Sequence, residues 1–173
     1  MEYIDQMGAA LNIEDRPKRI VSLVPSQTEL LHYFGLENEV VGITKFCIHP
    51  QEWFQNKKRV GGTKKVNFDA IEALAPDLVI GNKEENEKSD IETLSKLYPT
   101  WMSDIVTLED AFEMILKLGV LLDKSEKAVH LVDQLQSGFT EIRSRKGGRD
   151  QSVAYFIWQD PMMVAAPGTF IDE

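Results

Sequence analysis

Short apolar segments alternate with helix-like segments along most of the chain. Four of the apolar segments are rich in β-branched or aromatic residues and predict strands at 19–24, 40–46, 77–82 and 100–104. Apolar residues three or four positions apart predict helices at 27–34, 68–75, 86–97 and 107–122. Such alternation predicts β-α-β units, so the expected fold class is α/β with a parallel sheet. We expect a short polar arm at 1–18 and a loop at 47–65.

The longest periodic segment, 123–146, predicts one amphipathic helix about 33 Å long. Asp123 and Glu126 have the spacing of a capping box, and Gly147-Gly148 would end the helix. Four apolar side chains are expected to face inward: Leu131, Leu135, Phe139 and Ile142. The helix fits a strut between two lobes. A cap helix on a single α/β domain fits the periodicity equally well, and only the order of the segments favours the strut.

A fifth apolar segment, 152–158, follows this helix and predicts another strand. We therefore divide the chain into an N-terminal α/β lobe at 1–106, a helical segment at 107–148, and the incomplete start of a second lobe at 149–173. Without the rest of its lobe, the apolar strand at 152–158 is expected to pair with another copy of the chain.

Composition narrows the classes of partner and compartment. A net charge of −9 and a pI near 4.9 argue against nucleic acid or an anionic membrane, since both would repel the chain. The single cysteine excludes an internal disulfide. Residues 1–19 lack the apolar core of a signal peptide, and no run is long enough to cross a membrane. The expected location is the cytosol, or the exterior for a mature form whose export signal is absent.

The loops that follow parallel strands are the candidate site, because such sheets bind ligands beyond the carboxyl ends of their strands. These loops lie at 24–27, 45–53, 82–87 and 103–104. Ser26, with Glu29 three residues later, predicts the N-cap of the first helix. The run 83–86 has two interpretations that we weigh equally: a solvated helix start, or the wall of a cleft.

Known catalytic and metal-binding motifs are absent or incomplete. The sequence GGTKK at 61–65 lacks the spacing of a phosphate-binding loop and indicates a simple turn. Cys47 and His49 are weak candidates for metal ligands, because two ligands do not make a site. They fit the wall of a cleft better. His32 and His130 are expected on helix exteriors, and no nucleophile motif is present.

Three segments together resemble a known family: PKRIVSLVPSQTELLHYFGL with VVGIT, FDAIEALAPDLVI, and the long helix. They are similar to the class III substrate-binding proteins of ABC importers for vitamin B12, iron-siderophores and haem. The resemblance covers residue 5 to the end. It implies two α/β lobes joined by one rigid helix, with the ligand between them. It also implies a periplasmic or cell-surface location, with a cytosolic one as the alternative.

The resemblance implies a binding protein and not an enzyme, without a cofactor of its own, that delivers cobalamin or a ferric siderophore to an ABC permease and ATPase. The expected ligand-binding residues are those at the strand ends: Pro25, Ser26, Gln27, Phe46, Cys47, His49, Lys83, Glu84, Glu85, Asn86 and Asp104. An acidic residue of this lobe, Glu85 or Glu87, is expected to dock on permease arginines. The rival hypothesis is a cytosolic doubly wound enzyme or corrinoid-handling protein.

Overall fold

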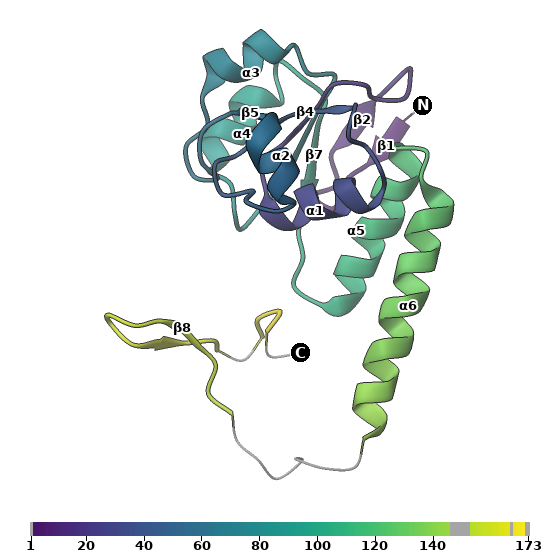
Figure 1. Cartoon of the computed structure of the whole chain (residues 1–173), viewed down its shortest axis with the longest axis vertical. Helices are drawn as coiled ribbons and strands as arrows, with labels where there is room; N and C mark the ends of the chain where they lie inside the picture. Colours follow the sequence, from purple (N-terminus) through teal and green to yellow (C-terminus); the bar gives the residue numbers. More distant parts are fainter. Residues whose placement is uncertain (1, 146–152, 167, 172–173) are drawn as a thin grey trace.

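Five short parallel strands form the central sheet. The computed structural model (Figure 1) describes residues 2–145, 153–166 and 168–171. The strand order is β5-β4-β3-β6-β7. The strands are β3 (Ile20–Ser22), β4 (Val40–Ile43), β5 (Lys58–Arg59), β6 (Leu78–Asn82) and β7 (Thr100–Ser103). Every neighbouring pair is parallel, which confirms the predicted α/β class.

Helices cover both faces of the sheet. The first core packs the sheet against α1 (Pro25–Tyr33), α2 (Gln51–Asn56), α5 (Leu108–Leu121) and α6 (Ser125–Ser144). The second core packs the other face against α3 (Phe68–Leu74) and α4 (Lys88–Leu94). Successive strand residues alternate between the two cores: Ile20 lies in the first and Val21 in the second. The result is a three-layer lobe.

The expected loop at 47–65 contains regular structure, so that prediction was wrong. Helix α2 and strand β5 both lie inside it. Trp53 explains the helix: its side chain is 2% exposed and its ring meets His32 of α1 edge-on, 5.2 Å between centroids. Burial of this one large side chain stabilises a helix too short to form by itself.

The N-terminal arm forms a short β-hairpin. Its strands β1 (Glu2–Ile4) and β2 (Ala10–Asn12) pair antiparallel. The buried Asp5 carboxylate accepts hydrogen bonds from the backbone N–H groups of Met7 and Ala9 (2.9 and 2.8 Å) and from that of Met102 in β7 (3.1 Å). Because the third bond joins the hairpin to the sheet, Asp5 ties the chain's start to the edge strand.

Two predicted helix caps are wrong. Helix α1 begins at Pro25, with Val24 as its N-cap, because proline presets the helical φ at the first position. Ser26 therefore lies inside the first turn and does not cap. Asp123 has a left-handed φ of 55° and ends the turn between α5 and α6, and the N-cap of α6 is Lys124. The N-cap of α3 is Asn67, whose side chain accepts from the Ala70 N–H.

Helix α6 is a single long helix, as predicted, but only its N-terminal half is buried. Ala128 and Val132 are buried, and Leu131 and Leu135 are half-buried against the first core. Phe139 and Ile142 are 38% and 60% exposed, so their predicted burial was wrong. The reason is geometric: α6 runs antiparallel to the shorter α5 and extends past its start (Figure 1). The helix ends at Ser144 with Arg145 as its C-cap, two residues before the predicted end, and Gly147-Gly148 lie outside the described residues.

The C-terminal part is a second hairpin, made of β8 (Phe156–Trp158) and β9 (Met163–Val164). The expected strand is thus shorter than 152–158, whose first residue lies outside the described part. It pairs within the chain, which the sequence did not predict. Its apolar side chains remain exposed, with Tyr155 at 57% and Trp158 at 63%.

Two helix glycines provide a matched test of the α5–α6 packing. A Cβ on Gly119 of α5 would lie 2.4 Å from the Cβ of Ala128 in α6, whereas nothing lies within 4 Å of Gly138 in α6. We expect Gly119→Ala to destabilise the fold by about 1–3 kcal/mol through overpacking. Gly138→Ala should instead stabilise it by about 0.5–1 kcal/mol. Chemical denaturation measures both, and equal stabilities would contradict the described contact.

The C-terminal hairpin exposes large apolar side chains. We therefore expect the 173-residue chain to self-associate through 152–158 at micromolar concentration. Trp158→Lys should shift the chain towards monomer in light scattering. Ile142→Lys is the control, since Ile142 is 60% exposed but lies in α6. A monomeric wild-type chain would rule this surface out.

Candidate functional site

The carboxyl ends of the five parallel strands bring their following loops to one edge of the lobe. This is the side towards which the C-terminal half of α6 extends (Figure 1). In open α/β sheets this edge is where ligands bind. The loops that meet there follow β3, β4, β5, β6 and β7, and the loop after β5 is an addition to the four that the sequence predicted.

At the β3 end, α1 begins directly and places its first residues at the edge. Pro25 is half-buried and Ser26 is exposed. Gln27 is 1% exposed, and its Nε2 donates to the Ser103 Oγ (2.8 Å) and the Gly81 carbonyl (3.3 Å). Gln27 therefore holds α1 against β6 and β7 from inside, and it is not exposed to a ligand as the sequence suggested.

The β4 loop separates two residues that the sequence paired. The Cys47 thiol is fully buried, within 3.2 Å of the hydroxyls of Thr28 and Thr44. His49 is exposed, as is Phe46 at 51%. Within the described residues no three His, Cys, Asp or Glu side chains are grouped as a metal site would need. Cys47 therefore stabilises the loop, and its placement argues against metal ligation.

The turn at 61–65 and the β4 loop line an open cavity of about 660 Å³ at this edge. Gly61 has a φ of 98°, and the Gly62 N–H donates to the Lys65 carbonyl (2.8 Å), so the segment is the simple turn that was predicted. The sequence did not identify it as part of the site. The residues lining the cavity are Lys45, Phe46, Gly61, Gly62, Lys64, Lys65, Val66, Asn67, Phe68 and Asp69.

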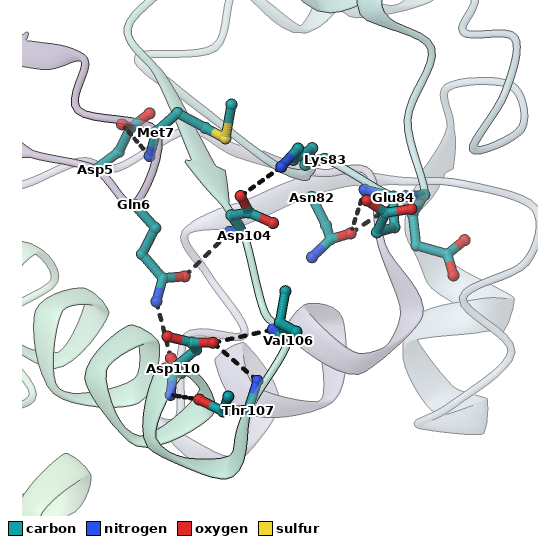
Figure 2. Close-up of polar contacts among 11 residues, drawn as sticks. Asp5, Gln6, Met7, Asn82, Lys83, Glu84, Asp104, Val106, Thr107 and Asp110 are labelled. Carbon is teal, nitrogen blue, oxygen red and sulfur yellow. Dashed lines mark hydrogen bonds and ion pairs between the residues drawn. The ribbon is translucent and has the colours of Figure 1, made fainter. Parts of the chain in front are cut away.

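Two asparagines organise the loop after β6. Asn82 Oδ1 accepts from the backbone N–H groups of Glu84 (2.9 Å) and Glu85 (3.2 Å) (Figure 2). The buried Asn86 accepts from the Asn82 N–H (2.8 Å) and donates to the Thr63 carbonyl (3.0 Å). Asn86 therefore joins this loop to the turn beside it. The side chains of Glu84 and Glu85 remain exposed.

An ion pair links the loops after β6 and β7. Lys83 Nζ lies 2.6 Å from the Asp104 carboxylate, which raises the pKa of Lys83 through a hydrogen bond and charge attraction (Figure 2). Lys83 thus stays protonated throughout the neutral range. The other Asp104 oxygen is buried without a hydrogen-bond partner in the described structure. The Asp104 carboxylate is therefore held by one of its two oxygens.

Gln6 of the N-terminal hairpin joins the loop after β7 to α5 through hydrogen bonds. Its Oε1 accepts from the Asp104 N–H (3.3 Å), and its Nε2 donates to the Asp110 carbonyl (2.8 Å) in α5 (Figure 2). Asp110 and Thr107 form the capping box of α5, and the hydrogen bonds from the Thr107 backbone and hydroxyl lower the pKa of Asp110. Sequence reasoning missed Gln6, because nothing local connects residue 6 to residue 104.

A family model described as periplasmic binding protein matches residues 20–173. The chain is 27% identical to an ABC transporter substrate-binding lipoprotein of Bacillus subtilis, over 98% of this chain and 56% of the relative. It is 26% identical to a vitamin B12-binding protein of Vibrio parahaemolyticus, over 89% of this chain and 56% of the relative. The chain thus spans about half the length of these curated relatives.

Solved structures show the same architecture. The periplasmic vitamin B12-binding protein of Vibrio cholerae superposes with a TM-score of 0.75 at 25% identity, over 91% of this chain and 62% of that one. A periplasmic haem-binding protein from Roseiflexus has a TM-score of 0.78 at 22% identity, over 90% of this chain and 61% of that one; this likeness concerns the fold alone.

These matches agree with the resemblance that the sequence motifs indicated. Among the described residues, no helix combines the length and apolar character needed to cross a membrane. The family match covers most of the chain and includes the sheet, α6 and the C-terminal hairpin. The chain belongs to the periplasmic binding protein family, a family of solute-binding proteins rather than enzymes.

Proposed function

We propose that the protein containing this chain is the substrate-binding component of an ABC importer. It captures a metal chelate, cobalamin or a ferric siderophore, and delivers it to a permease and its ATPase. Relatives named as an ABC transporter lipoprotein and as vitamin B12-binding proteins support this proposal. The proposed location is the periplasm or the cell surface, and the metal arrives as part of the ligand rather than as a cofactor.

The observation that carries the proposal is the set of anchored loops at one edge of the parallel sheet. Exposed charged side chains lie on loops whose backbones are held by the buried Asn86 and the half-buried Gln6. The exposed Phe46 and His49 lie on the β4 loop, which the bond from the Lys45 N–H to the Gly61 carbonyl joins to the neighbouring turn. Binding proteins gain affinity from such preformed walls, because little entropy is lost on binding. The lobe described here would be one wall of a cleft between two lobes.

The proposed contact residues divide by their exposure. Those that can reach a ligand are Pro25, Ser26, Phe46, His49, Lys83, Glu84, Glu85 and Asp104. Three others are buried and hold the loops in place instead: Gln27, Cys47 and Asn86. We therefore assign ligand contact to the first group, and loop geometry to the second.

Permease docking is proposed for Glu85 or Glu87. Both side chains are exposed at the start of α4, on the loop that leaves the candidate cleft. Exposed carboxylates at a rim guide the encounter with a basic partner more than they add affinity. This position would allow the permease to contact the lobe beside the bound ligand.

Ligand binding by the intact protein that carries this chain is the primary test. We expect cyanocobalamin or a ferric siderophore to bind with a Kd well below about 1 mM in calorimetric titration. Phe46→Ala should weaken binding about tenfold, because an exposed ring is lost from the cavity wall. Ile48→Ala is the control: Ile48 is equally exposed in the same loop but does not line the cavity. Absence of binding by every chelate would refute the proposal.

The docking role has a separate test. Glu87→Lys should reduce ATP hydrolysis stimulated by the liganded protein at least tenfold, and ligand affinity should be unchanged, since the charge faces the permease. Glu92→Lys is the control, because Glu92 is exposed farther along the same helix. Undiminished stimulation by variants at both Glu87 and Glu85 would remove this surface from consideration.

A further inference from the structure

The cavity beside β4 and β5 concentrates positive charge on an acidic protein. Three lysines line it, Lys45 from one loop and Lys64 and Lys65 from the other, together with a single carboxylate, Asp69. The whole chain carries a net charge of −9. Charges are screened over about 8–10 Å at physiological salt, so the local excess decides which small molecule is attracted.

The three ammonium groups are not neutralised within the described structure. No carboxylate forms an ion pair with any of them there. Lys64 Nζ donates to the backbone carbonyl of Glu84, and Lys45 Nζ lies 5.1 Å from the centroid of the Phe46 ring. All three side chains are exposed. Their charge is therefore available to an incoming anion.

The backbone that carries these lysines is fixed before any ligand arrives. The Lys45 N–H donates to the Gly61 carbonyl (2.8 Å), which joins the two loops. Asn86 bonds the Thr63 carbonyl (3.0 Å), and the Asp90 carboxylate accepts from the Val66 N–H (3.1 Å). The turn is thus held from both neighbouring elements. A preorganised cationic wall binds anions at a smaller entropic cost than mobile lysines do.

Aromatic surface accompanies the charge. Phe46 and Phe68 are 51% and 36% exposed and line the same cavity. Gly62 makes room for this arrangement, because a Cβ there would lie 3.2 Å from the Phe46 ring and 3.4 Å from the Lys45 side chain. Apolar faces beside several cations suit an organic ligand with an apolar frame and anionic oxygens at its rim.

We infer that the ligand is an anionic chelate whose peripheral carboxylates bind Lys45, Lys64 and Lys65. This inference rests on the proposed function and narrows it from metal chelates in general to those with free carboxylate groups. Ferric complexes of polycarboxylic acids carry such groups, and haem carries them as its two propionates. The lysine turn supplies hydrogen-bond donors and charge to them, and the two phenylalanines contact the frame.

The test titrates the intact protein with four probes of different charge. Ferric citrate and haemin carry free carboxylates, cyanocobalamin is net neutral, and ferrioxamine B is cationic. We expect one of the first two to bind at least tenfold more tightly than the last two, with affinity that falls as salt is raised. The double substitution Lys64→Gln with Lys65→Gln should weaken that binding roughly tenfold to a hundredfold.

Lys58→Gln is the matched control, since Lys58 is exposed on the neighbouring strand β5 but does not line the cavity. It should leave affinity unchanged, and denaturation curves check that every variant folds. Tight binding of cyanocobalamin or ferrioxamine B that the double substitution does not alter would overturn the inference, while the proposed function would stand. No binding of any probe would overturn both.

Discussion

Burial of the two central strands on both faces is the constraint on which the rest of this lobe depends. Ile20, Val21, Leu78 and Val79 have no exposed surface, so the backbone groups beside them must bond to neighbouring strands. Parallel pairing satisfies those groups only if each connection crosses a face of the sheet as a helix. All strands then end at the same edge, and five loops that are distant in sequence become neighbours.

Neutral amide side chains, more than ion pairs, hold these loops together. Asn86 and Gln6 each use both ends of the amide, one to accept and one to donate, and each joins two elements. An amide bonds two backbones without the desolvation cost of a buried charge. Charged side chains such as Lys83 and Glu84 are thereby left at the surface, where a ligand or partner can use them.

In this protein the net charge and the local charge affect different kinds of ligand. The excess of acidic residues repels a polyanion, whose charges extend over many screening lengths. A small anion senses only the groups within about one screening length, which in the cavity beside β4 and β5 are chiefly Lys45, Lys64 and Lys65. An acidic binding protein with a basic cavity is therefore consistent electrostatically, and the overall pI says little about the ligand.

The sequence by itself determined the elements whose signals are local. Runs rich in β-branched or aromatic residues predicted β3, β4, β6 and β7, and apolar residues three or four positions apart predicted α1, α3, α4 and α5. Family membership also followed from contiguous motifs. The edge of the sheet that carries the candidate site was predicted too, because strand direction follows from the β-α-β order.

Only the tertiary structure decided what each side chain does. Cys47 is buried beside the Thr28 hydroxyl of α1, and Asp5 and Gln6 bond to residues about a hundred positions away. The exposure of Phe139 depends on where α5 begins. Periodicity reports the few neighbours within a turn or a strand, whereas burial and hydrogen bonding depend on segments that folding brings together, and those contacts leave no local pattern.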